Sequence, residues 1–192
     1  MATKTIKKIN ARLKFLHRKN DFLTPDLRRL LCNALIQPHF DYVCSSWFPN
    51  LTQKLKKKLQ TTQNKCIRFC LQLPLITRLT FQHHKKINRL PIKERVDQNI
   101  LSHVFKSLNN DSPVYKRDIF KTASPSNSTR QAYCHLIQPL RKTNMGLNSI
   151  SYLGPSLWNK LPENIKQSSS LNTVKHKVKE FYLKNLQKDH NL

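Results

Sequence analysis

Residues 52–72 read TQKLKKKLQTTQNKCIRFCLQ, and no other part of the chain shows helical periodicity so clearly. At roughly 100° per residue, one arc of about 100° collects apolar and small side chains. These are Leu55, Leu59, Thr62, Cys66, Phe69 and Cys70, with Leu73 directly after the segment. The opposite side carries Lys54, Lys57, Lys58, Lys65 and Arg68, and Lys56 is the one exception. The pattern predicts a helix with one buried face and one row of cations.

Two helices are predicted before this segment. Residues 4–19 put Ile6, Ile9, Leu13 and Leu16 on one face and Lys4, Lys7, Lys14 and Arg18 on the other. The next helix starts at Thr24-Pro25-Asp26, where Thr is a good cap, Pro suits the first position and Asp suits the positive end. Its expected apolar stripe, which ends at Pro38, consists of Leu27, Leu30, Leu31, Ala34 and Leu35.

Three more helices are predicted after residues 52–72. They cover residues 78–88, residues 92–108 beyond Pro91, and a C-terminal stretch that Ser170 caps. The core face of the second is Val96, Ile100, Leu101, Val104, Phe105 and Leu108. The core face of the third is Leu171, Val174, Val178, Phe181 and Tyr182.

Residues 146–162, GLNSISYLGPSLWNKLP, hold both glycines of the chain. Alternation of apolar and polar residues over Leu147–Tyr152 favours a strand that glycine turns would bracket. Together with the run Tyr133–Leu140 it predicts a small β-hairpin, followed by a helical turn that Pro155 starts and that carries Trp158. Residues 109–130 lose periodicity and indicate a linker.

The charge of the chain points to a polyanionic partner. Thirty-five Lys and Arg face 10 Asp and Glu, which gives a net charge of +25, spread along the whole sequence. A compact body with this excess attracts nucleic acid, although a merely soluble basic protein is the alternative. Without an apolar run of signal-peptide or membrane-spanning length, we expect an intracellular protein, nuclear or cytoplasmic, with no membrane partner.

Most catalytic sites are excluded by residue type. Two glycines cannot build a glycine-rich phosphate loop, and neither a G-x-S-x-G nor an H-E-x-x-H motif occurs. Glu94 and Asp97 form the only near pair of carboxylates, and we interpret them, interleaved with Lys93 and Arg95, as a solvated ion-pair cluster. We therefore expect no cofactor and no small-molecule substrate.

A zinc site is the metal alternative. Cys66 and Cys70 are followed by His83 and His84, but adjacent histidines depart from the usual spacing of structural zinc ligands. The two thiols also lie on the apolar helix face, where free cysteine behaves as a small hydrophobe. Buried core thiols are the favoured interpretation, and Cys134 beside His135 has no evident third partner for a nucleophilic site.

The basic helix faces remain as the candidate site. Lysines in a row give sequence-independent, salt-sensitive binding to phosphates. The candidate nucleic-acid-binding residues are Lys54, Lys57, Lys58, Lys65, Arg68, Lys7, Lys14 and Arg18. Tyr42, Trp47 and Phe48 are aromatic neighbours in sequence that either stack on bases or, as we favour, pack between helices.

Four phrases together resemble the extreme C-terminal part of reverse transcriptases from jockey-like non-LTR retrotransposons. In the order of that family, they are KKINARLKFL…FLTPDLRRLLCNALIQPHFDYVCSSW (7–47), LKKKLQTTQNKCIRFCLQLP (55–74), INRLPIKERVDQNILSHVFKSLNNDSPVY (87–115) and SYLGPSLWNKLPENIKQSSSLNTVKHKVKEFYL (151–183). Such enzymes polymerise DNA through palm carboxylates that include a Tyr-x-Asp-Asp motif, and this chain has no adjacent pair of Asp residues. No catalytic residue carries over.

The patterns predict a mainly α protein with a further helical segment and the small β-hairpin, and the resemblance implies that its first part is a helical thumb-like bundle. The expected division is a thumb-like basic domain (1–75), a helical extension (76–110), a linker (111–130) and a hairpin with the C-terminal helix (131–192). We expect a non-catalytic fragment of a reverse transcriptase that grips RNA or DNA by its backbone. The alternative is a helical protein-interaction or structural module with no nucleic-acid role.

Overall fold

The computed structural model describes residues 2–42, 44–109, 111–122 and 135–190, with the side chains of 188–190 left aside. Within these ranges the fold is mainly helical, as predicted, and no helix is long and apolar enough to cross a membrane. The helical elements are α1 (Ala2–Arg18), η1 (Asn20–Phe22), α2 (Pro25–Leu31), η2 (Cys32–Ile36), α3 (Gln37–Asp41), α4 (Cys44–Trp47), α5 (Gln53–Leu71), α6 (Phe81–Ile87), α7 (Ile92–Leu108), α8 (Val114–Arg117), α9 (Asn144–Leu147), α10 (Ile150–Asn159), α11 (Glu163–Lys166) and α12 (Leu171–His190).

The contacts divide the chain into two compact units, which we describe separately. Unit 1 comprises residues 1–95 and 183–192, and unit 2 comprises residues 96–182. The candidate basic residues named from the sequence all belong to unit 1.

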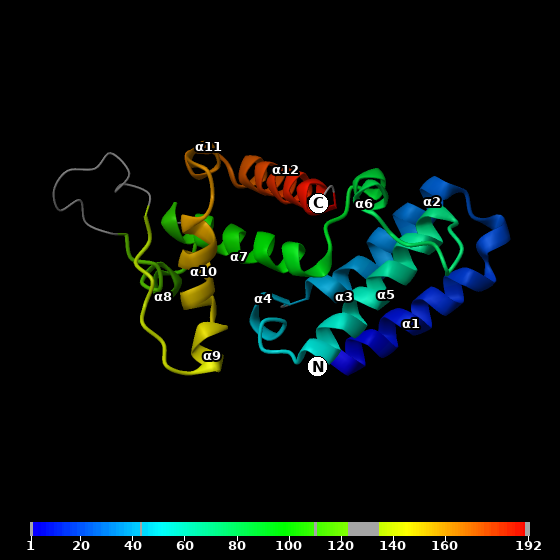
Figure 1. The fold of residues 1–192 in the computed structure, drawn as a ribbon, viewed down its shortest axis with the longest axis horizontal. Coiled ribbons are helices and arrows are strands. Elements are labelled where there is room, and N and C mark those ends of the chain that lie inside the picture. The colour runs from blue at the N-terminus through cyan, green and yellow to red at the C-terminus, as the bar shows by residue number, and fades with distance from the viewer. Residues whose placement is uncertain (1, 43, 110, 123–134, 191–192) are drawn as a thin grey trace. The chain divides into compact units, whose positions relative to one another are not determined.

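Helices α1 and α5 run side by side in unit 1 (Figure 1). The amphipathic patterns predicted both helices, and the structure confirms them. Helix α1 buries Ile9, Leu13 and Leu16. Helix α5 buries a wider arc than expected, because Gln63 and Ile67 are covered as well. The extra burial follows from its three neighbours, since α5 contacts α1, α2 and α6.

The segment after Thr24 folds as predicted at its start and differently along its length. The Thr24 hydroxyl caps α2 by accepting a hydrogen bond from the Leu27 amide at 3.3 Å. Pro38 does not end the helix. Proline has no N–H to donate to the carbonyl of the fourth residue before it, and the chain therefore forms the π turn η2 just ahead of Pro38.

The predicted leucine stripe of this segment is wrong. Leu27, Leu30 and Leu35 are exposed, whereas Arg28, Cys32, Ile36 and Phe40 are buried at intervals of four. Arg28 is held inside because its Nε and Nη2 atoms both donate to the Leu23 carbonyl, at 3.0 and 2.6 Å. Arg28, whose charged group is hydrogen-bonded to the backbone, thus occupies the buried face on which the hydrophobic pattern predicted leucines.

Amide side chains of α5 hold the chain that leads into α7. Gln63 is 1% exposed and donates to the Leu90 carbonyl at 2.9 Å. Gln60 accepts a hydrogen bond from the Ile92 amide at 3.1 Å. The start of α7 is fixed further by Arg95, whose guanidinium makes two 3.0 Å bonds to the Asp41 carboxylate. Arg95 therefore belongs to a contact between helices, in contrast to the solvated cluster expected around it.

The core of unit 2 lies between α7, α10 and α12 and the segments that join them. It is formed by Leu101, Val104, Phe105, Phe120, Leu136, Trp158, Leu161, Ile165, Val174 and Val178. Gln98 of α7 donates to the Lys175 carbonyl of α12 at 2.7 Å. The predicted helices at 92–108 and after Ser170 are confirmed, and the Ser170 hydroxyl caps α12 through the Thr173 amide at 3.2 Å.

The predicted β-hairpin is wrong over the described residues. Leu147–Tyr152 contributes to α9 and α10, and α10 begins at Ile150, five residues before the Pro155 start that the sequence suggested. Leu136 forms a single bridge with Thr122, and its backbone exchanges two 2.9 Å hydrogen bonds with the Asn159 side chain. The Asn159 side chain of α10 thus makes the hydrogen bonds to the Leu136 backbone that a neighbouring strand would otherwise make. Residues 123–134 of the predicted linker and hairpin lie outside the described residues.

Both glycines lie in helices rather than in turns with positive φ. Gly154 of α10 faces the core of unit 2, and a Cβ atom there would lie 2.6 Å from Phe120 Cε1 and 3.0 Å from Val104 Cγ2. The glycine therefore permits a close approach of α10 to its neighbours.

We expect Gly154→Ala to lower the free energy of unfolding by about 1–3 kcal/mol, because the added methyl overpacks the core. Gly146→Ala is the matched control, since its Cβ would be no closer than 3.2 Å to its nearest neighbours, the side chains of Arg141 and Thr143 just before α9. Urea denaturation followed by circular dichroism measures both variants. Equal stability of the two variants would contradict the close-packing role of Gly154.

Candidate nucleic-acid interface

Two adjoining hollows follow the line along which α1 and α5 meet. The first, of about 410 Å³, is lined by Ile6, Asn10, Lys54, Lys57, Lys58, Thr61, Thr62 and Lys65. The second, of about 730 Å³, is lined by Asn10, Leu13, Lys14, His17, Asn20, Lys65, Arg68, Phe69, Gln72, Leu73, Pro74 and Leu75. Because the hollows share Asn10 and Lys65, we call them together the basic groove. In the described part of the chain, no residue lining it is Asp or Glu.

Helix α5 supplies the cationic wall of the basic groove. Lys54, Lys57, Lys58 and Lys65 are all exposed there, and Arg68 is half-buried. From Lys54 to Arg68 the helix rises about 21 Å at ~1.5 Å per residue. The row is therefore long enough to follow several consecutive phosphates of one strand, which are about 3.4 Å apart along a duplex axis.

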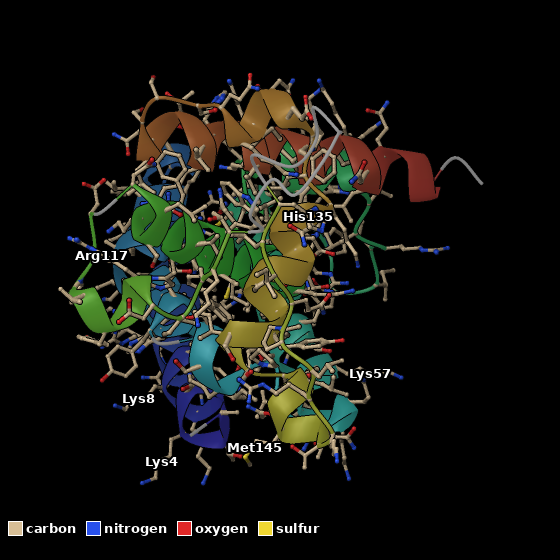
Figure 2. The ribbon with its side chains drawn as sticks, turned by 90° about the vertical axis from the view of Figure 1, so that its left-hand side faces the viewer. Lys4, Lys8, Lys57, Arg117, His135 and Met145 are labelled. Atoms are coloured by element: carbon tan, nitrogen blue, oxygen red, sulfur yellow. The ribbon has the colours of Figure 1, made fainter. Side chains whose placement is uncertain are left out.

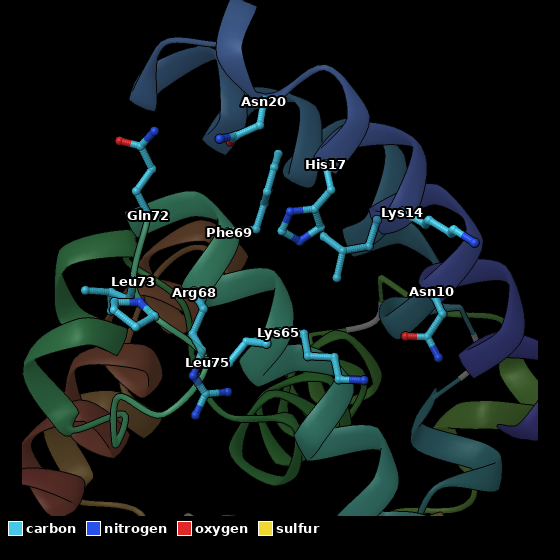
Figure 3. Close-up of a pocket in the computed structure, with 12 residues that line it drawn as sticks. Asn10, Lys14, His17, Asn20, Lys65, Arg68, Phe69, Gln72, Leu73 and Leu75 are labelled. Carbon is cyan, nitrogen blue, oxygen red and sulfur yellow. The ribbon is translucent and has the colours of Figure 1, made fainter.

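The candidate residues of α1 are only partly brought to this wall. Lys14 lines the second hollow, but its side chain extends away from the neighbouring His17 and Phe69 (Figure 3). Lys7 and Arg18 are exposed and do not line either hollow. Figure 2 shows Lys4 and Lys8 projecting from α1, away from Lys57 of α5. The structure thus brings together the five candidate cations of α5 and adds Lys14 of α1, whereas Lys7 and Arg18 lie outside the groove.

The helix ends add to the positive potential of the basic groove. Early residues of both helices line the same hollow, Ile6 of α1 with Lys54–Lys58 of α5, and late residues line the other, His17 with Phe69. Helices α1 and α5 therefore run in the same direction. Their positive dipole ends therefore lie at the same end of the groove, and neither first turn carries an acidic residue. Lysines at the positive end of a helix are unfavourable, and a bound anion relieves this repulsion.

Two cations of α5 have defined partners within the protein. Lys56, the exception in the cationic pattern, donates to the Pro49 carbonyl at 2.9 Å and lies 5.6 Å from the centre of the Phe48 ring. The Nε and Nη2 atoms of Arg68 donate to the Thr77 carbonyl at 3.2 and 2.9 Å. Arg68 thereby anchors the loop between α5 and α6 while its side chain lines the groove.

The aromatic residues near the groove differ from those that the sequence offered. Phe48 is buried, and Trp47 is half-buried with its Nε1 donating to the Tyr42 carbonyl at 3.0 Å. The groove itself contains His17, whose ring packs against Phe69 with 4.7 Å between centroids at 66°. Sequence reasoning missed this pair, although His17 and Phe69 lie at the cation-side edges of the two apolar faces.

The alternative metal ligands have structural roles. Cys32, Cys44, Cys66 and Cys70 are buried thiols, as expected for the core, and Cys134 lies outside the described residues. Burial raises the pKa of Cys66 to about 12, and its thiol donates to the Thr62 carbonyl. His83 completes the cap of α6 with Thr80, and His84 contacts the Arg89 carbonyl. No group of three potential metal ligands occurs among the residues described.

Arg68→Lys keeps the charge but loses the paired bonds to Thr77, so we expect the loop between α5 and α6 to open more often. Trypsin should then cleave faster after Arg78, which is exposed. Mass spectrometry of the fragments over time measures the rate. Lys65→Arg, a conservative exchange on the same face, is the control, and equal cleavage of both variants would contradict the anchoring role.

The geometry thus defines a basic groove in unit 1 and does not by itself name a ligand. The chain matches no protein-family model, no curated protein and no solved structure with which it was compared.

Proposed function

We propose that the chain binds the backbone of RNA or DNA through the basic groove, without preference for sequence and without catalysis. One observation carries the proposal: four exposed lysines and Arg68 share one face of α5, in a groove with no acidic residue among its described lining. Phosphates are the ligands that a row of lysines on a helix matches.

Electrostatics explains why a ligand is expected at this place. Four lysines occupy positions 54, 56, 57 and 58 at the positive end of α5, where like charges repel one another and the helix dipole. Lys56 turns to the protein, and the other three remain exposed. A polyanion in the groove would offset this repulsion and release its own counterions, which favours binding most at low salt.

The resemblance to jockey-like reverse transcriptases gives the proposal a context. We infer that residues 1–75 act as a thumb-like domain that grips template and primer, in a protein that does not itself polymerise DNA. The resemblance supports this inference through phrases at residues 7–47 and 55–74, which contain α1 and α5. These phrases contain most of the residues that line the basic groove.

A protein-interaction module is the second candidate, and one observation favours it. The α2–η2 segment exposes Leu30 at 63% and Leu27 at 39%, and Phe22 just before it is 82% exposed. Leu27 and Leu30 lie three residues apart on α2 and so on one side of the helix, and exposed apolar side chains that lie together are common at protein interfaces. This surface lies on residues other than those of the basic groove, so the two candidates can be separated by mutation.

We expect reversal of Lys54, Lys58 and Lys65 to Glu to weaken binding of a single-stranded oligonucleotide at least about tenfold at low salt. The slope of log affinity against log salt should fall by about 2–3, since each lost phosphate contact removes ~0.7–0.9. Fluorescence anisotropy at several salt concentrations measures both quantities.

The matched control reverses Lys4, Lys8 and Lys86, which are exposed in unit 1 and do not line the groove. It changes the net charge equally and should reduce affinity much less. Equal losses from the two triple variants would show that binding follows net charge alone. Absence of binding by the unaltered chain at low salt would refute the proposal and favour the interaction module.

A further inference from the structure

The larger hollow of the basic groove differs in chemistry from the row of lysines beside it. Its volume is about 730 Å³, within the usual range of ~300–1,000 Å³ for small-molecule sites. Leu13, Phe69, Leu73, Pro74 and Leu75 give it a mainly apolar lining. Phosphate binding needs no apolar hollow.

Its two walls present flat and apolar surfaces. His17, from α1, is exposed, and its ring is held against Phe69 of α5 with 4.7 Å between centroids (Figure 3). Leu75, from the loop after α5, also lines the hollow although it is 77% exposed. An ordered imidazole ring in a hollow that Leu75 also lines suits a planar ring as ligand.

The rim of the hollow offers hydrogen bonds suited to such a ring. Asn10, Asn20 and Gln72 line it, and each side-chain amide both donates and accepts. Lys65 borders both hollows, so a ring bound in the larger one would be joined to a backbone that continues along the lysines of the smaller one.

We propose that the larger hollow binds one nucleobase of a single-stranded nucleic acid whose phosphates follow the α5 lysines. The inference rests on the proposed function and narrows its ligand to a single-stranded nucleic acid. The base stacks on His17, packs against Leu75 and meets the rim amides with its polar edge. A base paired within a duplex cannot enter, because its faces are covered by neighbouring bases and its edge by its partner.

The backbone at Gln72 supports a role for that side chain. Gln72 ends α5 with φ at +52°, in the left-handed region where glycine is the usual residue. A glutamine there costs stability and gains a side chain that lines the hollow. We expect Gln72→Gly to raise the unfolding temperature while it weakens binding of the base, a combination that a purely structural residue would not give.

Two oligonucleotides of equal charge test the inference. Both have about 12 nucleotides, within the known range of single-strand sites, and one carries bases while the other is abasic throughout its middle. Anisotropy at one fixed salt concentration should show that the full chain binds the abasic strand at least about fivefold more weakly, the lower limit for loss of one stacked base. A duplex of the same length should also bind more weakly than the intact single strand at equal phosphate concentration.

Point variants locate the effect. His17→Ala and Leu75→Ala should each abolish the difference between the two strands, whereas Ile76→Ala should preserve it. Ile76 follows Leu75, is 95% exposed and does not line the hollow, so it controls for general loss of apolar surface. Circular dichroism melts verify that each variant is folded.

The outcomes separate this inference from the function on which it rests. Equal binding of the intact and abasic strands, with normal salt dependence, would overturn the nucleobase site and leave backbone binding in place. Tighter binding of the duplex would overturn it as well. Failure to bind any of the three oligonucleotides at low salt would instead refute the proposed function.

Discussion

The packing of α1 along α5 is the contact on which unit 1 depends. It covers the apolar faces of both helices and at the same time places two positively charged helices parallel, with their dipoles aligned. The free energy gained by burying Ile9, Leu13, Leu59 and Phe69 must therefore exceed the electrostatic repulsion between the two charged faces. The groove is a direct consequence of this balance, because the helices meet along their apolar faces and leave their charged edges apart.

The same contact connects the fold to the proposed ligand. Phosphates along α5 would reduce the repulsion, and a base beside His17 would fill the apolar hollow at the far end. Arg68 joins the two parts, since its bonds to Thr77 hold the loop that carries Leu75. The same few side chains thus affect both the stability of unit 1 and the binding proposed for it.

Amphipathic helices could be predicted from the sequence where apolar and charged residues separate onto two faces. Helices α1, α5, α7 and α12 show this separation, and so the lysine row on α5 was correctly placed on an exposed face. The pairing of α1 with α5, and with it the groove, could not be predicted, because periodicity shows which face is buried and not what covers it. The ring pair of His17 and Phe69 depends on that pairing.

The wrong predictions have local causes. The leucine stripe of α2 failed because Arg28 satisfies its charge on the Leu23 carbonyl, so a charged residue occupies the interior. The hairpin prediction was wrong for two reasons. The alternating pattern of Leu147–Tyr152 is also compatible with helix ends, and the Asn159 side chain, not a second strand, bonds the backbone of Leu136. Gly154 was assigned to a turn, yet it lies where α10 approaches Phe120 and Val104. Since any larger residue disturbs that contact, position 154 is a constraint on the sequence: a variant of this chain that keeps the fold of unit 2 should keep glycine there.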